Sequence, residues 1–334
     1  MMRTRKPAKT VRLQRLFFIG LFAVAFSTVH GTGIQGAWGK DLLLGTDGPG
    51  TFSYFAGRKV SRVINREVKG VTCTGVPTPD PVHMLTNLRT GSLDVVLVDS
   101  RTLFDAFRQK GRFRYMDIPF DNLRILCPLY EMPLTLVVRK DAGIRVLDDL
   151  RKKRVNIGAP GSSNRGAADI LFAAKGWTRN DFSLVGELPD SQGQDAMAFC
   201  HGTVQAMVSI GVHPNAALKQ LLQLCASRFI PMNDADIQRR VALHPAYSRM
   251  VIEAGTYLGQ GEAVETFGIQ GMLVTTEELN EKVALGIVTA LYNNSERLRS
   301  AHPALSPALP ETVGARTMEI PFHPGAARYY QTHR

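Results

Sequence analysis

The feature that most constrains this fold is a repeated order of apolar segment, turn of small residues and amphipathic helix. The first unit joins the apolar run 41–46 through the turn 47–50 to residues 53–65, where apolar residues recur at helical spacing. Segments 71–75 and 93–98 are also strand-like, and helices are expected at 82–90 and 99–108. Strands alternating with helices indicate an α/β sandwich with a mainly parallel sheet.

The same design recurs in the middle of the chain, where strand 155–158 enters the small-residue turn 159–163 and then helix 164–175, closed by Gly176. Two such units are what two equivalent α/β lobes would give. The other predicted strands are 123–129, 134–139, 182–185, 204–209, 229–232 and 268–275, and the other predicted helices are 146–152, 195–200, 216–226 and 277–299.

The N-terminal segment is typical of a secretory signal peptide. Six basic residues and no acids occupy the first 39 positions, and all six precede the apolar run 16–29. That run is shorter than the roughly 20 residues that span a bilayer, and small residues follow it. We expect cleavage after Gly39, because a strand-like segment follows at once, with Gly31 as the alternative site and an uncleaved anchor as the alternative reading. The mature chain is then periplasmic.

Charge gives little support for a nucleic-acid partner. The formal charge of +11 falls to +5 once the basic leader is set aside, and no run of five like charges follows it. No clear basic stripe interleaved with aromatic residues is present either. We therefore expect no nucleic-acid binding.

The four cysteines, Cys73, Cys127, Cys200 and Cys225, each lie in or beside an apolar run, and none form a CxxC pair. We expect buried free thiols. Export would place them in an oxidising compartment, so Cys200–Cys225 is the pair to test for a disulfide.

Polar residues at the two turns are the candidate ligand groups. Ser162, Ser163 and Asn164 lie at a predicted helix start, where free N–H groups and the helix dipole favour an anion such as a carboxylate. Arg165 could add a guanidinium to the same site. The alternative reading is ordinary helix capping. The segment lacks the Gly-Lys-Ser/Thr ending of a phosphate loop.

The first turn offers Thr51, Ser53 and Tyr54 in the same way. Asp99 follows a buried strand, and His213 lies between a strand and a helix. No histidine pair has metal-ligand spacing, and no nucleophile–base pattern occurs. We expect no metal, no cofactor and no enzymatic activity.

Taken in order, several segments resemble the TAXI family, the extracytoplasmic solute receptors associated with TRAP transporters. The most specific is 321–330 (PFHPGAARYY), similar to the family's Pro-x-His-Pro-Gly-Ala-x-x-Tyr-Tyr ending. The others are 129–130 (LY), 136–139 (LVVR) with 143–144 (GI), 149–162 (DLRKKRVNIGAPGS), 211–216 (GVHPNA) and 266–268 (TFG).

The resemblance implies a type II periplasmic-binding-protein fold, with two α/β lobes, a ligand cleft and a two-crossing hinge. Lobe 1 is then discontinuous, comprising 40–135 and 268–334, and lobe 2 comprises 136–267, after a signal peptide at 1–39. By this resemblance the receptor closes on a small polar or anionic solute, a carboxylate or amino acid-like compound, and delivers it to the membrane subunits of a TRAP permease.

Departures from the family pattern cluster on the edge of lobe 1. The family's Gly-Gly-Thr-Tyr-Tyr-Pro turn appears as 50–55 (GTFSYF), and polar Ser and Asn positions have become Pro81 and Met84. Its Gln-Ser-Asp appears as 99–101 (DSR), which makes Asp99, Ser100 and Arg101 ligand candidates. We expect a solute other than the usual glutamate- or glutamine-like ligand, such as another small carboxylate.

Two rival functions remain at this point. An enzyme could use the same architecture. An exported sensor or partner-binding module with a degenerate cleft, and with no transport role, is the principal alternative.

Overall fold

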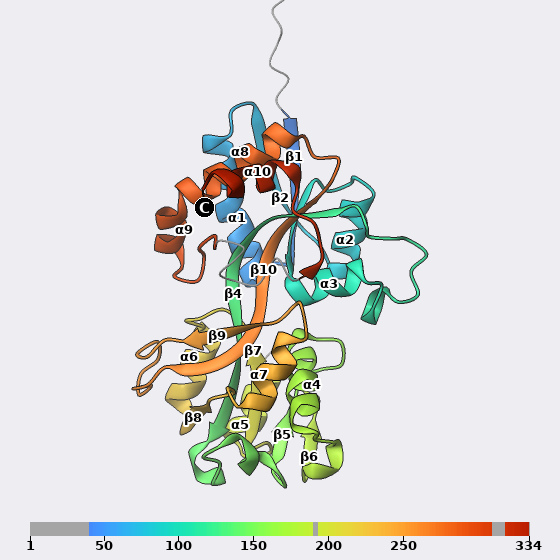
Figure 1. Ribbon diagram of the computed structural model, residues 1–334. Coiled ribbons are helices and arrows are strands. Elements are labelled where there is room, and N and C mark those ends of the chain that lie inside the picture. Colours follow the sequence, from blue (N-terminus) through green and yellow to red (C-terminus); the bar gives the residue numbers. More distant parts are fainter. Residues whose placement is uncertain (1–39, 190–192, 309–317, 334) are drawn as a thin grey trace, which may run out of the picture. The chain divides into compact units, whose positions relative to one another are not determined.

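The structure is a computed structural model that describes residues 40–189, 193–308 and 318–333 (Figure 1). The chain divides into two compact units, Met1–Ala37 and Trp38–Arg334, and everything below concerns the second. The predicted signal peptide lies outside the described residues, as do both of its cleavage positions.

Strands form where apolar residues run or alternate. They are β1 (Lys40–Thr46), β2 (Val71–Pro77), β3 (Val95–Asp99), β4 (Leu123–Arg139), β5 (Arg154–Asn156), β6 (Leu184–Gly186), β7 (Ala206–Ile210), β8 (Ser227–Ile230), β9 (Ser248–Ile252) and β10 (Val264–Thr276).

Helices occupy most of the segments between them. They are α1 (Phe52–Glu67), α2 (Pro81–Arg89), α3 (Ser100–Phe107), α4 (Ser163–Lys175), α5 (Gln194–Cys200), α6 (Ala216–Leu224), α7 (Ala235–Ala242), α8 (Glu281–Asn293), α9 (Ser295–Ala301) and α10 (Pro324–Thr332).

The described strands form one sheet in the order β2-β1-β3-β10-β4-β7-β5-β6, with β8 on β4 and β9 on β10. Pairing is parallel within β1–β3, called here the first strand group, and within β5–β7, called the second strand group. The long strands β4 and β10 are antiparallel to each of their partners. The prediction of a mainly parallel sheet is therefore wrong for the sheet as a whole, because β4 and β10 pair antiparallel with their neighbours. It is right only within each of the two strand groups.

A single strand, β4, replaces the two strands expected at 123–129 and 134–139. Its first part pairs with β10 as far as Pro133, and the residues from Leu134 onward pair with β7 and β8. Proline has no N–H to donate to a ladder, so Pro133 is tolerated where the strand changes partner. In Figure 1, β4 and β10 run together from one strand group toward the other.

Two glycines let β4 and β10 approach closely. A Cβ on Gly268 would lie 2.3 Å from the Met132 carbonyl oxygen, and one on Gly271 would lie 2.1 Å from the Tyr130 ring. The Tyr130 side chain therefore lies directly over the Gly271 backbone and is only 6% exposed. A side chain at Gly268 would meet the β4 backbone and force the two strands apart, and one at Gly271 would displace the Tyr130 ring.

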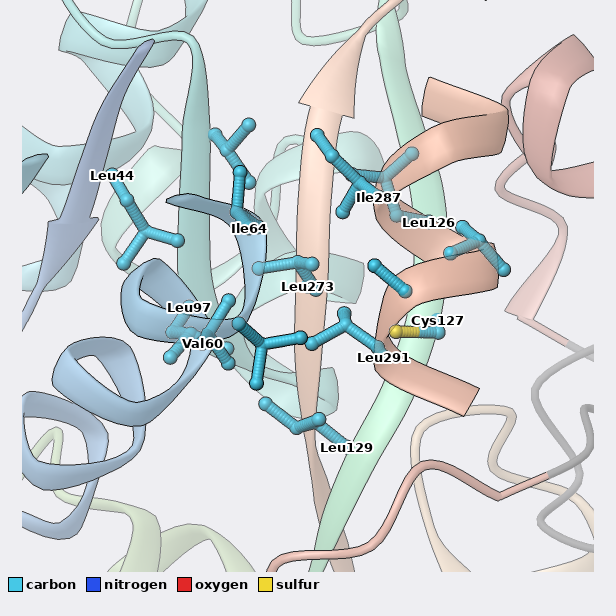
Figure 2. Close-up of a cluster of buried hydrophobic side chains, with 14 of the residues drawn as sticks. Leu44, Val60, Ile64, Leu97, Leu126, Cys127, Leu129, Leu273, Ile287 and Leu291 are labelled. Carbon is cyan, nitrogen blue, oxygen red and sulfur yellow. The ribbon is translucent and has the colours of Figure 1, made fainter. Parts of the chain in front are cut away.

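Apolar side chains cover both faces of the first strand group. Alternate residues of β3 belong to different clusters: Val95 and Leu97 pack toward α1 and α8, while Val96 and Val98 pack toward α2 and α3. A strand covered on both faces reads as a continuous apolar run. Figure 2 shows the first cluster, whose labelled residues are Leu44, Val60, Ile64, Leu97, Leu126, Cys127, Leu129, Leu273, Ile287 and Leu291.

The second strand group has its own core. Leu136 of β4 and Val208 of β7 pack with Leu171 of α4 and Ile237 of α7. Neither α7 nor β9 was predicted from the sequence, because both are short and α7 carries three charged residues in eight. In β9 only Met250 and Ile252 are buried.

Two predicted helices differ in detail. The long helix expected at 277–299 is instead α8 and α9, separated at Asn294, which caps both ends of the break. The helix expected at 146–152 is a single 3₁₀ turn at Leu147–Leu150, where the Asp149 carboxylate accepts backbone N–H groups.

Cys200 and Cys225 form a disulfide with Cα atoms 5.4 Å apart, so the expectation of free thiols is wrong for this pair. The reason is that α5 ends at Cys200 and α6 ends just before Cys225, and the two helices pack together. Cys73 and Cys127 are free and buried, as expected. Burial raises the pKa of the Cys127 thiol to about 12.

Among the residues that the structure describes, no helix is long and apolar enough to cross a bilayer.

Removing the disulfide should destabilise the fold. The bond closes a loop of 25 residues, and loop-closure entropy for that length is worth about 3 kcal/mol. Replacing both cysteines, Cys200→Ser with Cys225→Ser, should lower the free energy of unfolding in urea by about this amount. A reductant should destabilise the parent chain similarly and leave the double variant unchanged. Equal sensitivity of both proteins to reductant would contradict the assignment.

Candidate functional site

The candidate site lies where the two strand groups meet along β4 and β10. Ser100 begins α3 and is 2% exposed. Its hydroxyl donates to the Ala246 carbonyl at 2.7 Å and accepts from the Gln270 N–H at 3.1 Å. This predicted ligand residue therefore ties α3 to β10 and to the segment before β9.

Arg101 reaches from α3 to α4. A Cβ on Gly166 of α4 would lie 2.5 Å from the Arg101 guanidinium carbon, so the guanidinium rests on that helix backbone. It also pairs with Asp105 at 3.6 Å. The structure thus brings this predicted residue to the other strand group, with an acidic partner already in place.

Tyr247 is a residue that the sequence analysis missed. It is 6% exposed, and its hydroxyl has no hydrogen-bond partner within the described part of the chain. Burial raises the pKa of the Tyr247 hydroxyl, Arg101 opposes the shift and Asp99 adds to it. The hydroxyl thus lies within electrostatic reach of α3, though no sequence signal pointed to it.

Two carboxylates follow neighbouring parallel strands. Asp47 comes after β1 and Asp99 closes β3. Burial raises the pKa of Asp47 to about 6; the Asp99 charge adds to the shift, and a Ser53 hydrogen bond opposes it. Asp99 is committed to α3, because its carboxylate accepts from the Thr102 N–H and hydroxyl at 2.9 and 2.7 Å. Asp47 was read only as a turn residue, although it follows a strand end as Asp99 does.

The predicted residues of the first turn serve the local structure. Thr51 caps α1 by accepting from the Tyr54 N–H at 3.2 Å, and its hydroxyl donates to the Gly48 carbonyl. Ser53 is buried and accepts from the Asp47 N–H. Tyr54 itself is half-buried in the first turn of α1.

The second turn is similar. Ser162 caps α4 by accepting from the Arg165 N–H, and Ser163, which is half-buried, begins the helix. Asn164 is buried and accepts from the Ile210 N–H at 2.8 Å. The Arg165 guanidinium pairs with Asp169 and Glu187, at 2.8 and 2.5 Å. Capping accounts for Ser162, and an ion-pair network accounts for Arg165.

The two turns are not joined directly. Within the described ranges, no hydrogen bond or ion pair connects the segment 48–54 to the segment 158–165. α3 makes contacts with the second strand group instead, through Ser100, Arg101 and Phe104.

His213 lies on the loop after β7 and is held at both ring nitrogens. Nε2 lies 3.0 Å from the Thr135 hydroxyl, and Nδ1 lies 2.6 Å from the Tyr257 hydroxyl. Burial lowers the pKa of His213 to about 4, so the ring is neutral at neutral pH. Among the described residues, no group of three or more His, Cys, Asp or Glu could hold a metal ion.

A cavity of about 490 Å³ lies beside the part of β4 and β10 that passes between the two strand groups, called here the β4–β10 crossing. Of the predicted residues, only His213 lines it. The remaining lining residues are Pro128, Tyr130, Glu131, Pro133, Pro214, Val251, Ile252, Glu253, Thr256, Gln270, Pro303, Ala304, Ser306 and Ala308. This size is in the usual range for small-molecule sites. Desolvation raises the pKa of Glu131.

Asp47 should make stability depend on pH. A carboxyl whose pKa is raised in the fold binds more protons folded than unfolded, so stability falls as pH rises from about 4 through about 6. The loss is up to about 3 kcal/mol, because one pKa unit is worth about 1.4 kcal/mol. Asp47→Asn should therefore be more stable than the parent chain in urea at about pH 7.5, and the difference should shrink towards about pH 4. A difference independent of pH would show that Asp47 ionises freely.

Solved structures share this fold at low sequence identity. The chain is similar to a TctC solute binding protein from Polaromonas, with a TM-score of 0.57 and 14% identity over 87% of this chain and 96% of that one. It is also similar to XAC2383 from Xanthomonas citri bound to ATP, with a TM-score of 0.53 and 11% identity over 88% and 98%. PhnD1 from Prochlorococcus marinus in complex with methylphosphonate matches with a TM-score of 0.50 and 12% identity over 80% and 92%.

These likenesses confirm the expected fold class, a mixed α/β fold of the periplasmic-binding-protein type. The sequence itself matches the model of the NMT1-like family over residues 44–332. A match over this much of the chain shows that the protein belongs to the NMT1-like family.

Proposed function

We propose that this chain is an extracytoplasmic solute receptor that holds a small polar or anionic solute, a carboxylate or amino acid-like compound, between two lobes. Lobe 1 comprises 40–135 and 268–334, and lobe 2 comprises 136–267. The observation that carries the proposal is the connection of two strand groups by the continuous strands β4 and β10. Solute-binding proteins of the same fold support it.

Such a receptor works by a shift between open and closed arrangements. A solute changes that equilibrium only if its affinity for the two arrangements differs, which requires contacts from both lobes. Ser100 and Arg101 already reach from α3 to the other strand group. The eleven residues assigned from the sequence, from Thr51 to His213, remain part of this proposal.

The disulfide and the predicted signal peptide support a periplasmic location. A disulfide between Cys200 and Cys225 persists in an oxidising compartment. We place the mature protein in the periplasm, after cleavage of the signal peptide at Gly39 or Gly31. Binding is its activity, and no enzymatic reaction is part of the proposal.

The finer assignment, to the TAXI receptors with a TRAP permease as partner, rests on the segment 321–330. His323 of this segment caps α10, and its Nε2 lies 2.8 Å from the Leu279 carbonyl oxygen. Tyr330 donates to the Leu126 carbonyl of β4 at 2.7 Å. The motif therefore attaches α10 to the sheet and stabilises the fold, which explains why proteins of the same fold would share it.

One observation favours a second function, a sensor or partner-binding module without transport. The side chains of Thr51, Asp99 and Ser162 cap helices, and the guanidinium groups of Arg101 and Arg165 are paired with acids. If those bonds persist with solute present, few of the assigned groups are left to bind it. A protein that binds no small molecule would fit this alternative.

The first experiment is native mass spectrometry of the chain from residue 40 isolated from the periplasm, with identification of any released compound. We expect one unmodified organic acid or amino acid per chain. Added back at 100 times its Kd, it should stabilise the protein by about 2.7 kcal/mol, and X-ray scattering should show a smaller radius of gyration. An empty protein, with no thermal shift across carboxylates, amino acids and sugars, would favour the partner-binding module instead.

Arg101→Ala tests the assigned site. If Arg101 binds the solute's carboxylate, its loss should weaken that solute at least about tenfold, because hydrogen bonds to charged groups are worth roughly 1.5–3 kcal/mol. Arg112→Ala is the matched control, since Arg112 pairs with Asp80 on the surface. Unchanged affinity for every carboxylate tested would remove Arg101 from the site.

A further inference from the structure

We propose that the 490 Å³ cavity beside the β4–β10 crossing binds the protonated amine of a small organic cation with an apolar body. The inference rests on the proposed receptor function and narrows its solute, among the polar and amino acid-like compounds proposed above, to those that carry a protonated amine.

The cavity takes walls from segments that are far apart in the sequence. Tyr130 and Glu131 come from β4, Gln270 comes from β10, and residues 251–253 come from the end of β9. The loop carrying His213 and the segment 303–308 after α9 complete it. Both predicted lobes therefore contribute, which is the condition under which a bound solute can act on a hinge.

The carboxylic acids of the lining are two glutamates. Glu131 and Glu253 line the cavity, and no lysine or arginine does. Neither glutamate has an ion-pair partner among the residues that the structure describes. Two unpaired carboxylates at one cavity attract a cation and repel a carboxylate.

His213 does not offset the negative charge of the two glutamates. Its ring nitrogens are occupied by Thr135 and Tyr257, and burial lowers its pKa to about 4. At neutral pH the ring adds no positive charge to the cavity. The charge of the lining is therefore set by Glu131 and Glu253.

The arginines assigned to a carboxylate solute are elsewhere and already paired. Arg101 pairs with Asp105, and Arg165 pairs with Asp169 and Glu187. Neither guanidinium lines the cavity. A solute carboxylate would have to displace an acidic side chain from one of them, whereas an amine meets unpaired glutamates.

The rest of the lining suits an apolar body. Four prolines, Val251, Ile252 and two alanines surround the acids. The Tyr130 ring is fixed over Gly271, and an aromatic ring close to an ammonium adds a favourable cation–π interaction. The occupant that fits these groups is a compact amine with an aliphatic or aromatic body.

Calorimetric titration at about pH 7 and low ionic strength, where surface charges are least screened, tests this with three probes of similar shape. They are 2-phenylethylamine, the anion 3-phenylpropanoate and the neutral 2-phenylethanol. We expect the amine to bind at least about tenfold more tightly than either of the others. Glu131→Gln and Glu253→Gln should each weaken the amine about fivefold or more, because each removes one charge and keeps the shape. Glu262→Gln, on a residue outside this cavity, should leave amine binding unchanged.

The inference is overturned if 3-phenylpropanoate binds as tightly as the amine, or if both glutamine variants keep the parent affinity for the amine. It is also overturned if the amine does not bind. In each of these cases a carboxylate or amino acid found by native mass spectrometry would leave the receptor proposal standing. If native mass spectrometry and the thermal-shift tests also find no small-molecule solute, both the amine inference and the receptor proposal fail.

Discussion

The close approach of β4 and β10 is the constraint on which the other features depend. β10 pairs with β3 of the first group and with β4, and β4 pairs with β7 of the second, so the sheet is continuous only if β4 and β10 stay paired. Gly268 and Gly271 permit that contact, and Tyr130 fills the space that Gly271 leaves. This pair of strands also positions the cavity, the Ser100 hydrogen bonds and the helices α3 and α4.

Charge is distributed unevenly around the crossing. Arg101 and Arg165 are paired with acidic side chains, while Asp47, Glu131 and Glu253 have no ion-pair partner among the residues that the structure describes. Burial of Asp47 costs stability at neutral pH. A buried carboxyl kept at such a cost is typical of a site where function rather than stability selects the residue.

Much of the architecture could be predicted from the sequence because it follows from local patterns. Helical spacing predicted α1 and α4, and glycine with positive φ at Gly176 ended α4 as expected. The direction of β4 and β10 could not be predicted, because strand pairing is decided by partners far away in the chain. For the same reason, two apolar runs around Pro133 were read as two strands.

The candidate site could be predicted only in outline. Asp99 was expected to flank a buried strand, and the structure confirms that placement at the end of β3. Ser100 and Arg101 were singled out from the family resemblance; the structure brings both to the other strand group, and their role as ligands stays a prediction. Their side-chain partners could not be known, since a capping serine and a ligand-binding serine look alike in sequence. Tyr247 and Glu131 carry no local signal. They become candidates only when folding places one hydroxyl without a partner and one carboxylate at a cavity.

The glycines at the crossing also limit how such a protein could change its selectivity. A new side chain at Gly268 would separate the strands, and one at Gly271 would displace the Tyr130 ring, so neither position can simply add a new recognition group. Glu131 and Gln270 pair through their backbones, so their side chains can be exchanged for any except proline without removing a ladder donor. New specificities are thus expected to arise by exchange at these flanking positions and in the loops, while the crossing itself is inherited unchanged.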